Sequence, residues 1–401
     1  MEKRSLAIFF FAGCFSAVTD GCHVRACQGV EMLLALGWRV VVYSYRNHHQ
    51  WPWNPKGIEA FRTRFPGAEL VLDDWSRKLA IVQKFKGLIS YLGGRPAARA
   101  LRTHLPGLTP EFDRLLRDPD LKLALVSYPW GMSHLNGSPG PHIIVDTHDL
   151  AALERIQDDP PGRPGPRSIL TLKRELFYLG EVDEIWSTSY SEGLFLKSLL
   201  ERDRVRIVPP ALQGWSDPRP AGVAPTYDLV FVGSNNRWNP SAISGFLNSY
   251  AGWGLPLKIA IAGSVCRDKR VAAASGAELL GFVDDLNLLY ASTRAVICPV
   301  EGTGTKIKII EALSAGRPVF AAPGAFTGLL PGYEDCVFPL TRESVAAVLG
   351  DSRALAAAQV EALRYARAYS FEHVVAETRS GLAGAAETFV ASPSALAMSS
   401  R

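Results

Sequence analysis

The first half of the chain alternates continuous apolar runs with a segment of helical periodicity. The runs Leu6–Ala12 and Trp38–Tyr45 have the length and composition of buried strands. Between them, Val24–Leu36 repeats apolar residues at helical spacing and ends at Gly37. This order predicts a parallel sheet with right-handed crossovers. Further strands are predicted at Leu121–Ser127, His142–Asp146, Glu184–Ser187 and Arg206–Val208.

A second series of the same kind begins at Tyr227–Gly233. Its later strands are predicted at Leu257–Ala262, Glu278–Leu280, Ala295–Cys298 and Pro318–Ala321. A segment rich in proline and glycine, residues 209–222, separates the two series. The pattern predicts an α/β fold of two Rossmann-like, doubly wound parallel-sheet domains, residues 1–210 and 211–363. Such sheets bind ligands outside the carboxyl ends of their strands, so two facing domains would form a binding cleft.

The N-terminus allows a second interpretation. Glu2-Lys3-Arg4, the run Leu6–Phe11 and Ala12-Gly13-Cys14 resemble a short signal peptide with a lipoprotein cleavage site. We favour a first buried strand, because the following residues continue directly into a loop, a helix and a strand. No other run reaches the ~20 apolar residues that a membrane-spanning helix needs.

The composition of the chain favours two domains and excludes some classes of function. The 401 residues exceed one ordinary core, which favours two domains. A net charge of +4 is small for this length, and a nucleic-acid binder would be more basic. The six cysteines show no CxxC pair and no metal-ligand spacing, so we expect reduced thiols, no metal site and a cytoplasmic location.

The segment Glu301–Phe320 contains the strongest chemical signal. A glycine-rich turn, Thr303-Gly304-Thr305, precedes a helix that opens with lysines. Backbone N–H groups and hydroxyls at a helix N-terminus favour a phosphate. Lys308 and Glu311 are three residues apart and share a helix face, whereas Lys306 falls at the helix tip. The alternative is a surface helix with an ordinary lysine–glutamate pair.

This segment resembles the nucleotide-sugar motif of GT-B-fold retaining glycosyltransferases, the group 1 or family 4-like enzymes that include sucrose synthases and many bacterial polysaccharide enzymes. The other matching segments follow in order along nearly the whole chain: Gly21–Arg25, Asp146–Asp149, Phe231–Pro240, Leu280–Asp285 and Tyr365–Glu372. The resemblance implies an acceptor-side N-terminal domain, a donor-binding C-terminal domain, and helices over residues 364–391 that cross back to the first domain. Residues 392–401 are expected to be a disordered tail.

The resemblance also implies roles for residues of the motif. Glu311 matches the second glutamate of the family, which contacts the ribose hydroxyls of the donor. Thr303 stands where the family has its first glutamate, which contacts the donor sugar, and Glu301 lies two residues earlier. Either Glu301 or the hydroxyl of Thr303 is therefore the implied sugar contact.

The residues expected to contact the donor phosphates also differ from the family pattern. After Gly233 and Ser234 the family usually has an arginine and a lysine, but here only Arg237 is cationic. Lys306 and Lys308 would compensate, because a diphosphate leaving group needs cations. No metal is required if these cations do that work. The spacing Asp118-Pro-Asp120 precedes a strand and is interpreted as a turn rather than a metal motif.

Two places in the first domain add candidates. Gly21 would let backbone N–H groups approach the donor phosphate, with Arg25 beside it; the alternative is a loop glycine and an exposed first-turn arginine. His148 follows a strand, where it could contact the donor sugar or position the acceptor. Asp146 and Asp149 could instead be helix caps, and we rank His148 above Asp149.

The implied reaction is transfer of a sugar from a UDP-, GDP- or ADP-sugar, with retention, to a glycan, lipid-linked or small-molecule acceptor. The candidate catalytic residues are Lys308, Arg237, His148 and Glu301. The candidate donor-binding residues are Gly21, Arg25, Gly233, Ser234, Thr303, Gly304, Thr305, Lys306 and Glu311. No cofactor and no nucleic-acid partner are expected.

Three alternatives stay open. A degenerate protein could bind a nucleotide sugar or a partner without catalysis, and an epimerase or a phosphorylase could use the same architecture. The basic, partly apolar stretch 77–104 is either a solvated helix with a core stripe or a surface that contacts the inner face of the plasma membrane.

Overall fold

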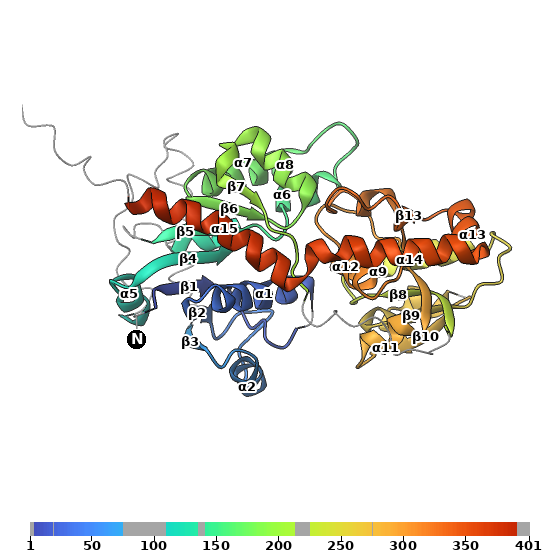
Figure 1. Cartoon of the computed structure of the whole chain (residues 1–401), viewed down its shortest axis with the longest axis horizontal. Helices are drawn as coiled ribbons and strands as arrows, with labels where there is room; N and C mark the ends of the chain where they lie inside the picture. Colours follow the sequence, from blue (N-terminus) through green and yellow to red (C-terminus); the bar gives the residue numbers. More distant parts are fainter. Residues whose placement is uncertain are drawn as a thin grey trace, which may run out of the picture.

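The computed structural model describes residues 4–18, 20–74, 110–134, 141–212, 225–274 and 276–390. These residues form two parallel sheets, of seven and six strands, each covered by helices (Figure 1). The predicted α/β fold with two doubly wound domains is confirmed. The basic stretch 77–104 and the predicted tail 392–401 lie outside the described residues.

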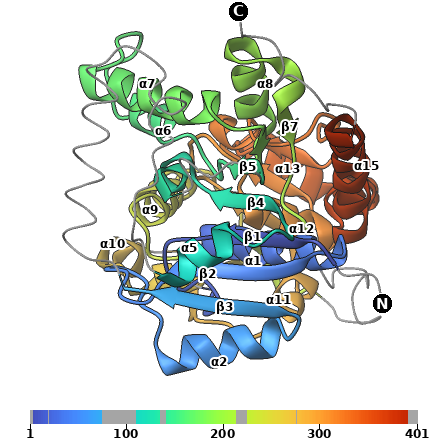
Figure 2. The same cartoon turned by 90° about the vertical axis from the view of Figure 1, so that its left-hand side faces the viewer.

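The first sheet has the strand order β3-β2-β1-β4-β5-β6-β7, and every neighbouring pair is parallel (Figure 2). Its strands are β1 (Leu6–Phe10), β2 (Arg39–Tyr45), β3 (Ala68–Asp73), β4 (Leu121–Ser127), β5 (His142–Asp146), β6 (Glu184–Ser187) and β7 (Val205–Ile207). The N-terminal apolar run is thus a strand in the interior of the sheet, between β2 and β4, as we favoured from its sequence. The strand order reverses between β1 and β4, which makes the carboxyl ends of these two strands the switch point where such sheets bind ligands.

Both faces of the first sheet are buried. Along β1, Ala7 and Phe9 belong to one core cluster, whereas Leu6, Ile8 and Phe10 belong to the other. This explains why the strand reads as a continuous apolar run rather than an alternating one. The helices of this half are α1 (Gly21–Ala35), α2 (Pro55–Arg64), α5 (Pro110–Leu116), α6 (Ala151–Ile156), α7 (Pro166–Gly180) and α8 (Tyr190–Leu199).

The second sheet is also parallel, with the strand order β10-β9-β8-β11-β12-β13. Its strand order reverses between β8 and β11, which is therefore its switch point. Its strands are β8 (Tyr227–Val232), β9 (Ile259–Ala262), β10 (Glu278–Gly281), β11 (Thr293–Cys298), β12 (Val319–Ala321) and β13 (Val337–Pro339). The helices are α9 (Asn239–Tyr250), α10 (Lys269–Ala273), α11 (Leu286–Ala291), α12 (Ile307–Ser314), α13 (Arg342–Gly350), α14 (Ser352–Ala366) and α15 (Phe371–Val390).

The last helix leaves the second half of the molecule and runs over the first (Figure 1). Val374 and Val375 of α15 are buried in the same core cluster as Phe9 of β1. The guanidinium of Arg379 donates a hydrogen bond to the carbonyl of Ala35, at the end of α1, over 3.0 Å. Helix α15 is therefore part of the core of the N-terminal half.

Among the described helices, none combines the length and the apolar composition that crossing a membrane requires. All six cysteines lie in the described residues and are free thiols, and four of them are buried: Cys14, Cys27, Cys298 and Cys336.

Candidate active site

The turn predicted to bind phosphate lies at the switch point of the second sheet. It follows β11, and the loop after β8, which starts at Gly233, lies beside it at the same edge. Gly302 and Gly304 have φ angles of +133° and +79°, in the region that favours glycine. The ammonium group of Lys306 donates to the carbonyl oxygens of Gly302 and Thr303 over 3.2 and 2.6 Å. Lys306 thus fastens the turn that precedes α12.

Helix α12 begins at Ile307, with Lys306 as its N-cap residue, so Lys306 lies at the tip of the helix and Lys308 inside it. Ile309, Ile310 and Leu313 of this helix are buried in the core of the second sheet. The remaining face carries Lys308 and Glu311, which places the pair on one face, as their spacing predicts.

Lys308 is held by two groups from the neighbouring elements. Its ammonium group donates to the side-chain oxygen of Asn239 over 2.9 Å and lies 4.3 Å from the centre of the Phe231 ring. Removal from water lowers the pKa of Lys308, and the nearby Glu311 carboxylate opposes this shift. An additional anion would therefore be favoured beside this cation.

Glu311 is the matching carboxylate. The hydroxyl of Tyr290 lies 3.5 Å from its side-chain oxygen, and burial raises the pKa of Glu311, with Lys308 acting in the opposite direction. Lys308 therefore lies about one turn closer to the N-terminus of α12 than Glu311 does. This order suits a nucleotide, whose phosphates would lie beside Lys308 and whose ribose hydroxyls would donate to Glu311.

The threonine hydroxyls of the turn are used within the protein. Thr305 donates to the carbonyl oxygens of Thr188 and Gly328, each over 2.8 Å. The Thr303 side chain lies close enough to the Glu192 carboxyl of the N-terminal half to oppose the rise of its pKa. We expected these hydroxyls to face a phosphate; in this structure the Thr305 hydroxyl joins the two halves of the molecule, which leaves backbone N–H groups and lysines for an anion.

The N-terminus of α1 lies opposite that of α12. A Cβ atom added to Gly21, the first residue of α1, would stand 3.5 Å from the side chain of Ile307, the first residue of α12. Two helix N-termini therefore lie close to each other at the contact between the halves, and their partial positive charges favour an anion between them. The role expected of Gly21, an approach of backbone N–H groups to a donor phosphate, stays a prediction.

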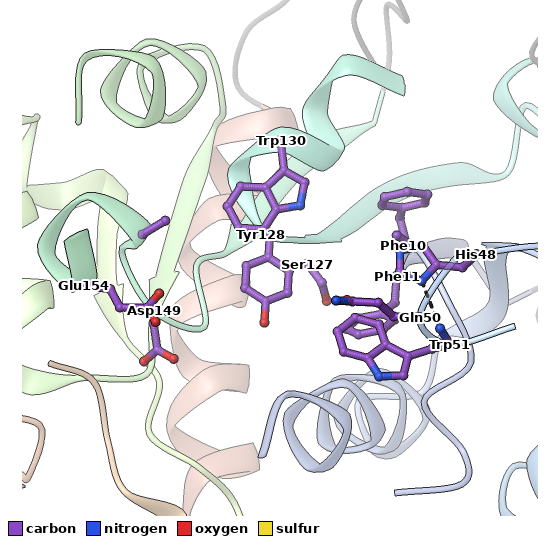
Figure 3. A pocket seen from close by; sticks show the side chains of 12 residues that line it. Phe10, Phe11, His48, Gln50, Trp51, Ser127, Tyr128, Trp130, Asp149 and Glu154 are labelled. Carbon is purple, nitrogen blue, oxygen red and sulfur yellow. Dashed lines mark hydrogen bonds between the residues drawn. The ribbon is translucent and has the colours of Figure 1, made fainter. Parts of the chain in front are cut away.

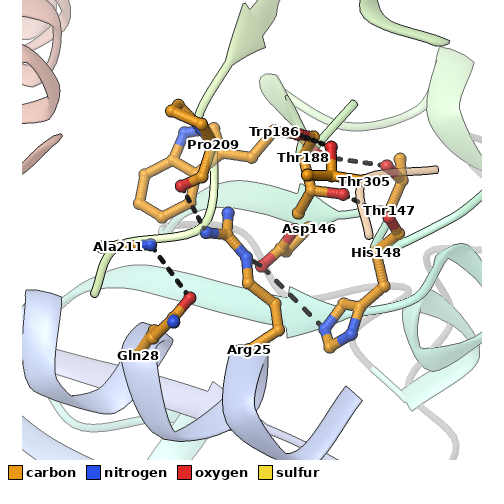
Figure 4. Close-up of polar contacts among 10 residues, drawn as sticks. All are labelled: Arg25, Gln28, Asp146, Thr147, His148, Trp186, Thr188, Pro209, Ala211 and Thr305. Atoms are coloured by element: carbon orange, nitrogen blue, oxygen red, sulfur yellow. Dashed lines mark hydrogen bonds and ion pairs between the residues drawn. The ribbon is translucent and has the colours of Figure 1, made fainter. Parts of the chain in front are cut away.

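Arg25 differs from both of our interpretations, because its side chain is neither exposed nor open to the cleft. It is 3% exposed, and its guanidinium pairs with Asp146 at 2.7 Å and donates to the carbonyl of Pro209 over 3.1 Å (Figure 4). Gln28, one turn further along α1, accepts a hydrogen bond from the backbone N–H of Ala211. Arg25 and Gln28 therefore fasten the chain crossing at residues 209–211 to α1, and Asp146 is an ion-pair partner rather than a helix cap.

His148 lies beyond the carboxyl end of β5, as expected for a ligand-binding residue. Its backbone has a φ of +56°, which is costly for a residue with a side chain, and its carbonyl accepts a hydrogen bond from the Thr188 hydroxyl. Its ring stacks on Tyr128 at 4.3 Å and lies 3.9 Å from the Asp146 carboxylate. Burial lowers the pKa of His148 to about 4, so the ring is neutral at pH 7. A neutral imidazole can hydrogen-bond a hydroxyl without adding charge.

Two further candidates, Arg237 and Glu301, lie near the contact between the two halves. Arg237 stacks on Trp238 at 3.9 Å and reaches the N-terminal half, where it pairs with Glu154 and Asp158 at 3.3 and 3.2 Å. The side chains of Arg237, Glu154 and Asp158 are all largely exposed, so these ion pairs contribute little to stability. Arg237 can therefore leave its two carboxylate partners and bind a ligand. Glu301 is exposed and lies beside Gly324, where an added Cβ atom would stand 2.6 Å from its carboxylate.

Two carboxylates lie at the domain contact: Asp149, which we ranked below His148, and Glu192, which the sequence did not single out. Asp149 lies against the turn so closely that a Cβ atom on Gly304 would stand 1.8 Å from its oxygen. Crowding by protein atoms raises the pKa of Asp149 to about 6, although the side chain keeps contact with solvent. Glu192 is 1% exposed, and burial together with the charge of Asp149 raises its pKa to about 8. The sequence indicated a possible site residue only at Asp149, because this residue follows a predicted strand.

The buried Glu192 predicts a pH-dependent stability. Its pKa in the folded protein is about 8, whereas an ordinary glutamate has a pKa of 4.5, so its favourable contribution is complete below pH 4.5 and is lost as the pH rises through 8. Glu192→Gln keeps a hydrogen-bond acceptor and cannot ionise. We expect its melting temperature to match the wild type near pH 4.5 and to exceed it increasingly towards pH 9, in a thermal unfolding series. The exposed Glu343→Gln serves as control; a pH-independent difference for Glu192→Gln would contradict the assignment.

Comparison with known proteins identifies the architecture. Residues 226–364 match the family model described as glycosyl transferases group 1. No curated protein matches the chain by sequence. Solved structures superpose over nearly the whole chain. Sucrose-phosphate synthase from Thermosynechococcus elongatus has a TM-score of 0.67 and 14% identity, covering 97% of this chain and 100% of its own.

Two further structures show the same arrangement. A TarM variant from S. aureus, solved with fondaparinux, alpha-GlcNAc-glycerol and UDP, has a TM-score of 0.62 and 9% identity, covering 94% of this chain and 99% of its own. WaaG, a glycosyltransferase of lipopolysaccharide biosynthesis, has a TM-score of 0.57 and 15% identity, covering 93% and 98%. At such low identities the superpositions show the fold alone, and the expected GT-B architecture is confirmed.

Proposed function

We propose that this GT-B protein, whose residues 226–364 match the family model of group 1 glycosyl transferases, moves a sugar from a nucleotide-diphosphate sugar to an acceptor hydroxyl with retention of anomeric configuration. The observation that carries the proposal is the pairing of Lys308 and Glu311 on one face of α12, at the point where the N-termini of α1 and α12 meet. A diphosphate would lie between the helix termini and a ribose beside Glu311.

The charges of the site suit departure of a diphosphate. As the bond from the anomeric carbon to the leaving oxygen lengthens, negative charge grows on the diphosphate and positive charge on the sugar ring. Lys308, the two helix N-termini and the backbone of the glycine-rich turn would stabilise the leaving group without rearranging. Lys306 holds that turn in shape, and Arg237 would exchange its exposed carboxylate partners for the diphosphate.

The sugar ring would lie towards the N-terminal half. His148 is neutral because its pKa is low, and its ring would hydrogen-bond a hydroxyl of the transferred sugar. The acceptor oxygen then bonds to the anomeric carbon on the face that the diphosphate leaves, and its proton passes to a leaving phosphate oxygen. This route requires no protein base. Contacts of the turn with Thr188 and Glu192 keep the halves together and would exclude water, which limits donor hydrolysis.

Release of free nucleotide tests the proposal. The purified protein should release nucleotide from one member of a panel of UDP-, GDP- and ADP-sugars, and faster when a cell lipid extract or glycan mixture supplies acceptors. UDP-sugars are the first donors to examine, because the TarM structure was solved with UDP. Activity should persist with EDTA, and the product's anomeric configuration, read by NMR, should equal that of the donor. Turnover with inversion, or loss of activity on chelation, would contradict these parts of the proposal.

One observation favours a second candidate, a binding protein without catalysis. Thr303 replaces the first glutamate of the family motif, and its side chain lies beside Glu192. Two measurements distinguish the binding protein from the transferase. A non-catalytic protein would bind UDP, GDP or ADP in calorimetry but would release no nucleotide from any UDP-, GDP- or ADP-sugar.

A further inference from the structure

The residue that follows β6 is bonded to both halves of the molecule. Thr188 is 6% exposed, and its hydroxyl donates to the carbonyl of His148, beyond the end of β5. Its own carbonyl accepts a hydrogen bond from the hydroxyl of Thr305, in the glycine-rich turn of the other half, over 2.8 Å (Figure 4). Thr188 therefore contacts both the residue that we propose for the donor sugar and the turn that we propose for the diphosphate.

The hydroxyl of Thr188 extends the hydrogen bonding of the first sheet by one position. Backbone pairing between β5 and β6 ends where the N–H of Thr147 donates to the carbonyl of Trp186 over 2.9 Å. At the next residue, His148, φ is +56°, which an extended strand does not allow. A residue with a side chain keeps such a conformation only where surrounding contacts hold it. The Thr188 hydroxyl supplies one of these contacts, at the carbonyl of His148 itself.

The ring of His148 is not fixed by hydrogen bonds. Within the described residues neither ring nitrogen has a hydrogen-bond partner, and the Asp146 carboxylate lies 3.9 Å from Nε2, beyond hydrogen-bond reach. The ring stacks at 4.3 Å on Tyr128, whose ring also stacks at 4.5 Å on Trp130. Stacking is less directional than a hydrogen bond, so the direction of the His148 ring depends on its backbone.

The aromatic stack borders open space. Tyr128 and Trp130 line a cavity of about 330 Å³, and the stacked pair His48 and Trp51 lines it from the opposite side (Figure 3). Because no protein atoms fill this volume, the stack is not packed from every direction. The position of His148 then depends on its backbone contacts, among them the hydrogen bond from Thr188.

The segment after Thr188 also contacts the other half. Tyr190, the first residue of α8, donates its backbone N–H to the carbonyl of Gly328 over 3.2 Å, and Ser191 donates in the same way to Thr327. Gly328 packs directly on the glycine-rich turn, because a Cβ atom added to it would stand 2.6 Å from the carbonyl oxygen of Gly304. The segment therefore reaches the turn by two routes, and its distance from the turn is well defined.

We propose that Thr188 is a positioning residue of the transfer reaction: it holds His148 in register with the glycine-rich turn, so that the imidazole meets the sugar of a donor bound there. The inference rests on the proposed transferase function, and Thr188 would act through His148 rather than on the substrate. Such placement matters, because a misplacement of about 1 Å at a reacting centre can lower a rate by ~10²-fold.

Removing the hydroxyl tests the proposal. Thr188→Val keeps the shape of the side chain and the carbonyl that Thr305 uses, whereas Thr188→Ser keeps the hydroxyl. Thr293→Val is the matched control. Thr293 is also buried, and its hydroxyl also donates to a carbonyl, that of Leu289, over 2.9 Å, but it lies at the amino end of β11. Should Thr188→Val not fold, Thr188→Ala replaces it, because alanine places no additional methyl group beside the His148 carbonyl.

We expect Thr188→Val to lower kcat for nucleotide release about tenfold, while the Kd for the nucleoside diphosphate stays within about twofold of the wild type. Thr188→Ser and Thr293→Val should keep the wild-type kcat. The decisive comparison uses His148→Ala, in which adding Thr188→Val should cause no further loss, because the group that Thr188 positions is already absent. An equal loss in both backgrounds, or no loss in either, would overturn the proposal.

A measurement without turnover separates this inference from the transferase function. Burial lowers the pKa of His148 to about 4, so a ring that is no longer held and gains contact with water should titrate closer to the ordinary 6.5. NMR of the histidine Cε1 protons, with His148 assigned from the spectrum of His148→Ala, should show this rise in Thr188→Val and not in Thr188→Ser. If no donor releases nucleotide yet the titration moves, the transferase proposal fails while the hold of Thr188 on His148 stands. An unmoved titration in Thr188→Val would overturn the inference.

Discussion

Replacing Lys308 by methionine should lower turnover of the nucleotide sugar by ~10²–10³-fold, the usual cost of losing one preorganised group that stabilises transition-state charge. The ammonium group lies in a site from which water is partly removed, so no solvent can substitute for it when the diphosphate departs. Steady-state nucleotide release, measured with the best donor of the panel, checks the result. The loss should lie mainly in kcat, because charge on the leaving group is greatest in the transition state.

The same change should spare the fold. Burial lowers the pKa of Lys308, which means that the folded chain holds this charge at a cost, and methionine keeps the apolar stem against Phe231. The melting temperature should therefore equal or exceed that of the wild type. Lys258→Met is the matched control, because Lys258 also lies over a ring, 4.7 Å from the centre of Tyr227, but is exposed. Full activity in Lys308→Met, or an equal loss in Lys258→Met, would refute the role.

Replacing Glu311 by glutamine should weaken nucleotide binding by ~10–100-fold, which corresponds to the ~1.5–3 kcal/mol of hydrogen bonds to a charged group. Glutamine fills the same space and keeps an acceptor for the Tyr290 hydroxyl, so the helix should stay intact. Calorimetric titration with the nucleoside diphosphate measures the effect. Here the loss should appear in KM, because the ribose contact is the same in ground state and transition state.

The pH dependence gives a second readout for Glu311. Since burial raises the pKa of its carboxyl, the ionised form needed for two ribose hydroxyls is lost as the pH falls, and at a higher pH than for an ordinary glutamate. Wild-type affinity should therefore fall towards acidic pH, whereas Glu311→Gln should be weak and nearly flat. The exposed Glu334→Gln should follow the wild type. An acid-sensitive Glu311→Gln would assign the titration to another group.

The central strands and helix α12 could be predicted because the patterns that indicate them lie within a few consecutive residues. β4, β5 and β6 have consecutive apolar residues at their centres and the bounds that we predicted. The spacing of Lys308 and Glu311 alone puts these two residues on one face of α12. The edge strands β3 and β13 were missed. β3 mixes partly exposed residues with one buried valine, and β13 has only three residues, so neither shows the pattern of a buried strand.

The rest of the site depends on contacts between distant parts of the chain. Thr305 and Thr188 are 117 positions apart, and no local pattern reveals that the hydroxyl of one meets the carbonyl of the other. Arg25 has the spacing of an exposed first-turn residue, and only the fold places Asp146 and Pro209 around it. The stacked pairs His48–Trp51 and Tyr128–Trp130 come from separate segments, and no motif predicts that both line the same pocket.

The two chain crossings between the halves are bonded to each other. Leu212, in the first crossing, donates to the carbonyl of Tyr369 and accepts from the N–H of Phe371, in the second, over 2.9 and 3.1 Å. Arg25 and Gln28 anchor the first crossing to α1. The two connections between the halves are thus hydrogen-bonded to each other, and the first is held on α1. If the halves move, we expect them to move about this one place, which would bring the N-terminus of α12 back opposite that of α1.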